Sequence, residues 1–443
     1  MTPADELPEE GTRGMDARTK PRREAIAPLH ASMMKLRQVD DARGLRDLAV
    51  DWLSLVAIAS LTIAANEARV AAGWSPWASL PIFAAAIVLI GGGLHRLTGM
   101  GHEASHYVLL RDKFWNDLIG DLFCFFPVWS SVHFYRLFHM AHHQFVNDPE
   151  RDPDLRNMGA SKRVERFPMT RARFVLEYWL RPFTSPASFA RFQADYLYVN
   201  VFGKGGNVYM DRVPGGDGAS KGLRPATWLG LAYVVGLNAG LWALSASGLG
   251  RWAVPASIGA LAVALGVLKV LPERALFRSP FRQPYSPRFA SALRLAWFTA
   301  VIAGCACLRD FTGGRSVLYV TLLYIVPMAT TFPLFLLLRD VYQHANSDDD
   351  RITNTRVFRT DPFTRWAVFV HGQDLHTPHH LHPAIPYYHL EELHDLLKQL
   401  DPAYAGRVVE CSGTFRGRGD LPAILDVLGT EREASPGGSA RVA

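Results

Sequence analysis

The sequence predicts an all-α polytopic membrane protein with about six transmembrane helices, an interfacial helix and a histidine-rich cytoplasmic cap. The chain of 443 residues is 49% hydrophobic, and its apolar residues are gathered into blocks. Six of these blocks approach the roughly 20 residues that a helix needs to cross a bilayer. Nine of the 16 histidines fall into three short boxes and one further position, with a long histidine-free stretch before that position. Such grouping indicates a metal site built between membrane helices.

The apolar blocks define the expected membrane spans in chain order. They cover 49–66, 78–99, 226–248, 253–271, 293–311 and 316–338. The stretch 114–132 is also apolar and aromatic, but it contains Asn116, Asp117 and Asp121. We therefore expect it to form a helix that lies in or dips into the membrane surface. Trp115, Trp129 and Tyr135 are expected to anchor this region at the surface.

The distribution of charge predicts the orientation in the membrane. The chain has a net charge of +6, and its basic residues concentrate in the N-terminal tail and in the loop 272–292. Basic loops remain preferentially in the cytoplasm, which places both termini and all histidine boxes on that side. Because the apolar blocks favour a lipid surface as the partner of a basic chain, no nucleic-acid partner is predicted.

Composition divides the chain into four parts. Residues 1–47 are expected to form a polar, largely disordered tail, and residues 429–443 a second disordered tail. The membrane core is expected at 48–345, with the first two histidine boxes. A cytoplasmic cap with the third box is expected at 346–428, with helical periodicity in 390–397.

The spacing of the histidines suits metal binding. Histidines three or four residues apart share one face of a helix, and facing imidazoles suit zinc, iron, copper or nickel. Nine imidazoles are too many for one ion but could be shared by two. Pro378 places the third box in the first turn of a short helix. The expected ligands are His102, His106, His139, His142, His143, His344, His376, His379 and His380.

Acidic residues near these histidines are expected to orient the imidazole rings. Ligating histidines usually donate their second N–H group to a carboxylate or carbonyl. Asp340 lies four residues before His344 on the same helical face and could be a ligand, a base or the partner of a bound water. The other candidates lie within or beside the boxes: Glu103, Asp148, Glu150, Asp152, Asp154, Asp374 and 348–350.

The three boxes HEASH, HMAHH and HTPHH, in this order between hydrophobic spans, resemble the membrane fatty acid desaturase family. The resemblance implies two iron ions, cycling between Fe2+ and Fe3+, held by the eight box histidines and His344. It also implies O2, a lipid or acyl-chain substrate and a separate electron donor of the ferredoxin or cytochrome b5 type with its reductase. Two departures are Asp340, where some members carry asparagine, and four expected spans between the second and third boxes where many desaturases have two.

These observations predict a membrane-bound, O2-dependent di-iron desaturase of acyl chains. An acyl-chain, carotenoid or other lipid hydroxylase or ketolase on the same scaffold is the first alternative. A histidine-rich metal transporter or sensor is the second, but the spans 226–248, 253–271 and 316–338 contain only one charged residue, Lys269. The substrate chain is expected in an apolar tunnel between spans, and its anionic head could contact Arg136, Arg356 and Arg359.

Overall fold

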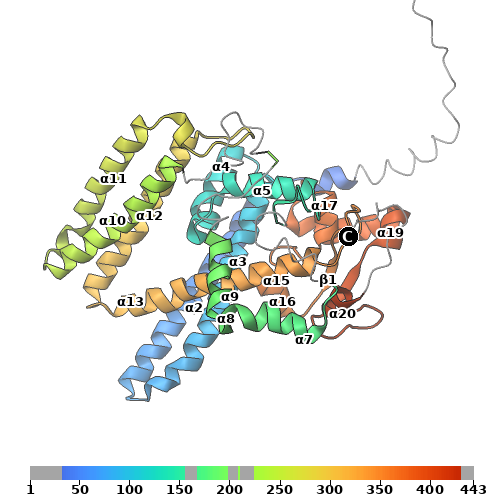
Figure 1. Cartoon of the computed structure of the whole chain (residues 1–443), viewed down its shortest axis with the longest axis horizontal. Helices are drawn as coiled ribbons and strands as arrows, with labels where there is room; N and C mark the ends of the chain where they lie inside the picture. Colours follow the sequence, from blue (N-terminus) through green and yellow to red (C-terminus); the bar gives the residue numbers. More distant parts are fainter. Residues whose placement is uncertain (1–31, 155–166, 198–207, 210–223, 431–443) are drawn as a thin grey trace, which may run out of the picture.

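The computed structural model describes residues 32–154, 167–197, 208–209 and 224–430, and the architecture is helical with six candidate membrane spans (Figure 1). All six expected spans are confirmed, including those at 49–66 and 293–311, which carry charged residues at or near their ends. The spans run over Asp41–Ala71, Pro76–Ser105, Pro225–Ala246, Gly250–Val270, Pro287–Phe311 and Arg315–His344. The chain is therefore a multi-pass membrane protein.

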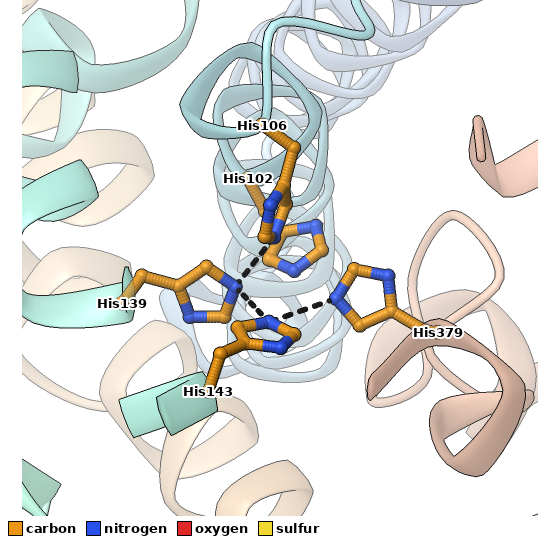
Figure 2. A group of neighbouring side chains, drawn as sticks. All are labelled: His102, His106, His139, His143 and His379. Carbon is orange, nitrogen blue, oxygen red and sulfur yellow. Dashed lines mark hydrogen bonds between the residues drawn. The ribbon is translucent and has the colours of Figure 1, made fainter. Parts of the chain in front are cut away.

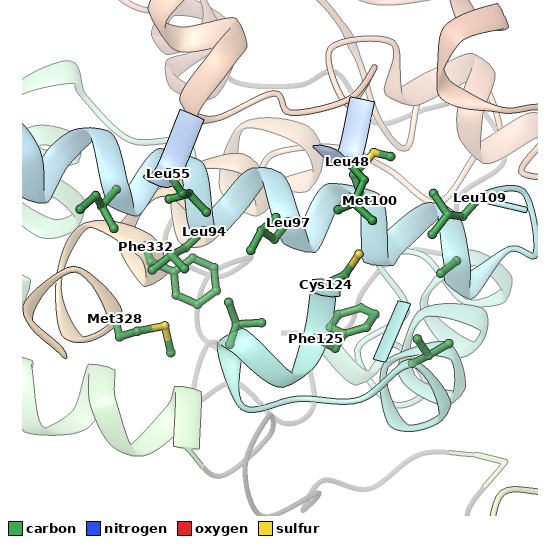
Figure 3. Close-up of a cluster of buried hydrophobic side chains, with 14 of the residues drawn as sticks. Leu48, Leu55, Leu94, Leu97, Met100, Leu109, Cys124, Phe125, Met328 and Phe332 are labelled. Carbon is green, nitrogen blue, oxygen red and sulfur yellow. The ribbon is translucent and has the colours of Figure 1, made fainter. Parts of the chain in front are cut away.

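Helix α3 (Ser79–Ser105) lies at the centre of the main bundle. It packs against α2 (Asp41–Ala71) and against the broken last span, which comprises α13 (Arg315–Val320), a π-helical turn (Thr321–Ile325), α14 (Val326–Ala329) and α15 (Thr331–His344). Figure 3 shows the buried contact, in which Leu97 and Met100 of α3 meet side chains from α2, α14 and α15. This packing fixes the end of α3, where the first histidine box lies.

Three further spans form a separate group at one side of the molecule (Figure 1). They are α10 (Pro225–Ala246), α11 (Ala253–Val270) and α12 (Pro287–Phe311), and they bury small apolar clusters among themselves. The end of α12 leads into α13, which joins this group to the main bundle. The described histidine boxes all lie outside these three helices.

The stretch 114–132 forms several short helical segments and not one continuous helix. It folds as α4 (Lys113–Ile119), a π-helical turn (Gly120–Phe125) and a short 3-10 turn (Phe126–Val128), and then bends by 88° into α5 (Val132–Gln144). Asn116, Asp117 and Asp121 are fully buried, so they do not face the membrane surface. Asn116 donates to the Ala104 carbonyl, and Asp121 accepts from the Val132 backbone N–H. These polar groups therefore join α3 to the bent segment. If this bent pair is one span, the total rises to seven.

The cap follows α15 and packs against the end of the bundle (Figure 1). Strand β1 (Val357–Arg359) pairs in parallel with β2 (Glu410–Ser412), and the surrounding helices are α16 (Pro362–Ala367), α17 (His376–Leu381), α18 (Leu390–Leu400), α19 (Pro402–Arg407) and α20 (Ile424–Gly429). The helical prediction for 390–397 is confirmed by α18. At the N-terminal side, α2 already begins at Asp41, ahead of the expected boundary at 48. Of the predicted tails at 1–47 and 429–443, residues 1–31 and 431–443 lie outside the described residues.

Candidate metal centre

Four helix segments bring the nine predicted ligands together. The C-terminal end of α3 supplies His102 and His106, and α5 supplies the three histidines of the second box. His344 is the last residue of α15, so it continues the sixth span directly. Helix α17 begins at His376 and carries the third box, as the proline pattern predicted. All nine side chains are buried or half-buried.

The nine imidazoles separate into two groups. In each group, one nitrogen of every ring lies within 4.8 Å of one nitrogen of every other ring. The first group, drawn in Figure 2, contains five rings that converge from α3, α5 and α17: His102, His106, His139, His143 and His379. The second group contains four rings: His142, His344, His376 and His380.

The helical spacing explains how the boxes divide between the groups. Residues four apart in a helix point in nearly the same direction, so His139 and His143 share the first group. His142 lies a further part-turn around α5 and joins the second group. In the third box, His376 and His380 join the second group, and His379 between them joins the first. The expectation that the histidines of one box share a single helical face therefore holds for the first box and is wrong for the second box. The third box is divided as well.

The separations between ring nitrogens fit ligands of a shared ion. In the first group, His139 Nε2 lies 2.9 Å from His106 Nε2 and 2.9 Å from His143 Nε2. In the second, His344 Nε2 lies 2.9 Å from His376 Nε2. At a metal–imidazole distance of about 2.1 Å, two ligands at a right angle lie about 3 Å apart. The donor set therefore fits two metal ions.

The protonation of the cap histidines agrees with a role as ligands. Burial, followed by the charges of His142 and Arg339, lowers the pKa of His379 to about 3. Burial and the neighbouring rings of His344 and His379 also hold the pKa of His376 well below its ordinary value. These rings are therefore neutral near pH 7, and the neutral imidazole is the form that donates its lone pair to a metal.

The outer nitrogens of three ligands contact oxygen atoms, as metal-bound histidines usually do. His102 Nδ1 lies 3.1 Å from Glu103 Oε1, and His344 Nδ1 lies 3.3 Å from the Asn354 carbonyl oxygen. His142 Nδ1 lies 3.2 Å from Asp152 Oδ1 and 3.3 Å from Asp154 Oδ2. The sequence correctly suggested Glu103, Asp152 and Asp154, whereas no sequence pattern indicated the Asn354 carbonyl.

The other acidic residues that were expected to orient imidazole rings were assigned less accurately. Asp374, expected to orient the third box, instead pairs with Arg365 at 2.8 Å. Asp148 pairs with Arg151, and Asp348 accepts a hydrogen bond from Thr353 at 2.6 Å. Asp340 is half-buried one turn before His344 and belongs to neither imidazole group. Its role as a base or water contact stays a prediction.

Two of the three arginines expected at an anionic head group serve the scaffold instead. Arg136 is buried and donates to Asp117 and to the Ala104 and Ser105 carbonyls at the end of α3. Arg356 is fully buried and donates to four carbonyls at the end of α15. Arg359 pairs with Glu391 at 2.7 Å. Because Arg136 and Arg356 are buried and their donors are already bonded, the head-group expectation is wrong for these two. For Arg359, whose pair with Glu391 is exposed, it stays a prediction.

Three residues near the centre were missed or misassigned from the sequence. The side-chain amide of Gln373 lies 3.2 Å from His102 Nδ1. The Tyr135 ring, expected at the membrane surface, stacks on His139 with a centroid distance of 5.2 Å. Arg339 lies near Tyr135 and the ligands. The sequence places Arg339 directly after the expected span 316–338, five residues before His344 and next to Asp340.

A multi-pass helical membrane protein with two buried groups of imidazoles has the donor set of a histidine-rich metal centre. The family model for "Fatty acid desaturase" matches residues 72–269 and 242–411 of the chain. These matches cover most of the sequence and all nine histidines. The chain belongs to the fatty acid desaturase family, which is consistent with an oxidoreductase of lipid metabolism.

Two curated relatives match shorter segments. The chain is similar to dihydrorhizobitoxine desaturase from Bradyrhizobium elkanii, at 33% identity over 122 residues, which are 27% of this chain and 34% of the relative. It is also similar to sn-1 oleoyl-lipid 12-desaturase from Arthrospira platensis, at 30% identity over 97 residues, which are 21% of this chain and 26% of the relative. The matched segments thus span about a third or less of each relative's length.

Proposed function

We propose that this protein is an O2-dependent di-iron oxidase that introduces a double bond into an aliphatic substrate. The observation that carries the proposal is the division of nine buried histidines into two groups with the nitrogen spacing of metal ligands. Imidazole suits iron as well as zinc, but the family is one of desaturases, and a metal ion that activates O2 to remove hydrogen must be redox-active, which zinc is not. Both curated relatives are named as desaturases.

The proposed reaction removes two hydrogens from neighbouring carbons. One –CH2–CH2– unit, O2, two electrons and two protons become –CH=CH– and two molecules of water. Two iron ions held by the nine histidines would supply the oxidising chemistry that an unactivated C–H bond requires. The electrons come from a separate ferredoxin or cytochrome b5 type donor with its reductase, on the cytoplasmic side where we place the boxes and both termini.

The chain's own residues hold the geometry and exclude water. Glu103, Asp152 and the Asn354 carbonyl fix the orientation of three rings, which keeps their inner nitrogens directed at the ions. The apolar cluster around Leu97, Met100 and Phe125 closes one side of the centre. A dry surrounding protects a reactive oxidant from side reactions.

The test is expression in a host of defined lipid composition, with measurement of iron in the purified protein and gas-chromatographic analysis of extracted lipids and acids. We expect bound iron and a new unsaturated product. Hydroxylated chains without any unsaturated product would support the alternative hydroxylase instead. Purified protein that binds zinc and forms no oxidised product would contradict the proposal.

A further inference from the structure

Gln373 is a buried polar residue beside the first imidazole group and is not one of the nine ligands. It lies in the segment between α16 and α17, three residues before His376. Its side-chain nitrogen lies 3.2 Å from His102 Nδ1 and 3.3 Å from His102 Nε2. Buried polar groups are nearly always paired, so the donor and the acceptor of this amide each require a partner.

The orientation of the Gln373 amide is fixed by Gln343 of α15, which is also buried. The side-chain nitrogen of Gln343 lies 2.8 Å from the Gln373 backbone carbonyl oxygen and 3.2 Å from Gln373 Oε1. A carbonyl oxygen only accepts hydrogen bonds, so the NH2 group of Gln343 faces Gln373. Because Gln373 Oε1 accepts from this same group, the NH2 group of Gln373 is turned toward His102.

The His102 ring leaves its Nε2 lone pair to a metal ion. Its Nδ1 atom lies 3.1 Å from Glu103 Oε1 and donates to that carboxylate, which is the usual arrangement of a ligating histidine. The amide nitrogen of Gln373 is almost equally distant from both ring nitrogens. Such a position lies over the face of the ring and in line with neither lone pair. The NH2 group of Gln373 therefore does not compete for the metal-binding atom of His102.

The same NH2 group lies close to the position of the first metal ion. Imidazole nitrogens bind metal at about 2.1 Å, so an ion on His102 Nε2 would lie within about 5.4 Å of the Gln373 amide nitrogen. An amide NH2 group donates hydrogen bonds and does not accept them, so it is not itself a metal ligand in this orientation. It can instead donate to a further small ligand of that ion.

We propose that Gln373 is a hydrogen-bond donor for a small anionic ligand of the metal ion held by the first imidazole group. The inference rests on the proposed function and adds to its metal centre a residue that touches the bound ligand. A hydrogen bond to a charged acceptor is roughly twice as strong as one between neutral groups. Gln343 holds the donor in place before the ligand arrives, so little rearrangement is needed when the ligand binds.

The competing role for Gln373 is to hold the His102 ring in its position. In that role Gln373 would determine how tightly the ion is bound, and it would not affect which further ligand the bound ion accepts. Metal content and anion affinity, measured on the same variants, therefore separate the two roles.

The experiment titrates azide into the purified full-length protein loaded with Co2+, and the cobalt absorption bands report binding. We expect Gln373→Leu to weaken azide binding at the first group about 10- to 100-fold at an unchanged cobalt content, as the loss of a hydrogen bond to a charged group implies. Gln373→Glu keeps the size of the side chain but presents an oxygen in place of the NH2 group, so it should weaken azide binding at least as much. Azide binding at the second group should be the same in all variants.

Gln193→Leu is the matched control for the loss of a glutamine amide. Gln193 lies on α9 (Pro186–Tyr196) and donates to the Ala329 carbonyl at the end of α14, at 2.5 Å. This variant removes a hydrogen bond of the helical scaffold, so its azide affinity and cobalt content should equal those of the wild type.

Equal azide affinities of the wild type and Gln373→Leu would overturn the inference. Loss of cobalt from both Gln373 variants would assign Gln373 to holding His102 and would overturn it as well. A wild-type protein that binds no cobalt would overturn the inference together with the metal centre.

Azide binding needs no turnover, so the inference and the proposed function fail separately. Azide binding that depends on Gln373, without any unsaturated product, would contradict the proposed function and leave the donor role standing. Desaturation by a protein whose azide binding is independent of Gln373 would contradict the donor role alone.

Discussion

The bundle that carries the histidines and the outer group α10–α12 are both apolar and helical, yet they pack differently. In the span that contains α3, 39% of the most apolar window is buried, against 11% in α10. A Cβ atom added at Gly101 would lie 2.6 Å from the Phe125 ring, whereas one at Gly236 would meet nothing within 4 Å. The helices that position the ligands are therefore closely packed against their neighbours. The outer helices present most of their surface to the membrane.

Removal of one ligand should give the largest difference between the regions. His142 lies in the second group and contacts Asp152, so His142→Ala should remove the metal ion of that group and abolish desaturation. His382→Ala is the matched control, because His382 follows the third box but belongs to neither group. Metal analysis and product chromatography check this prediction. Full iron content with intact turnover in His142→Ala would disprove the ligand assignment.

Removal of one partner of a buried ion pair should cause the next largest effect, which is a loss of stability. Asp117 is fully buried and accepts from Arg136 and His133, so Asp117→Ala leaves an uncompensated guanidinium between α3 and α5. We expect a loss of about 3–5 kcal/mol in stability, measured by thermal or denaturant unfolding in detergent. Beside the outer group, Glu273→Ala removes a carboxylate from the exposed pair with Arg288 and should cost only about 0–1 kcal/mol. Similar losses in the two variants would remove the proposed distinction between the regions.

Glycine-to-alanine substitutions should lower the stability in the histidine-bearing bundle and leave it unchanged or raise it in the outer group. Gly101→Ala forces the Phe125 ring to move and should destabilise the protein by about 1–3 kcal/mol. Gly236→Ala has open space and improves helix propensity, so it should be neutral or stabilising by up to about 1 kcal/mol. The shift in unfolding midpoint measures both. A destabilised Gly236→Ala would show that α10 has a close partner in the membrane.

Substitution of an outer partner of a ligand should change the metal affinity and leave the packing of both regions intact. Asp152→Asn keeps the size of the side chain but weakens its hold on His142, and we expect about a 10- to 100-fold loss of metal affinity. Asp148→Asn is the control, since Asp148 pairs with Arg151. Competition with a chelator measures the affinity. Equal affinities would show that Asp152 has no part in orienting His142.

The spans and the histidine boxes could be predicted because apolar length and short helical spacing are local properties of the sequence. The division of the boxes between two groups was not predicted, because it depends on how α5 and α17 face each other across the centre. The roles of Arg136 and Arg356 were misjudged for a similar reason. Arg136 binds carbonyl groups at the end of α3, which is distant in the sequence, and Arg356 binds carbonyl groups at the end of α15. No sequence motif marks a backbone carbonyl as such an acceptor.

The central claim is that the two imidazole groups hold one metal ion each, and counting iron in the purified protein tests it most directly. We predict two iron ions per chain in the wild type, measured by mass spectrometry, with nitrogen ligands in the X-ray absorption spectrum. His344→Ala should weaken only the second group and leave about one ion, since His344 belongs to that group alone. A single ion in the wild type, or two ions retained in His344→Ala, would contradict the account.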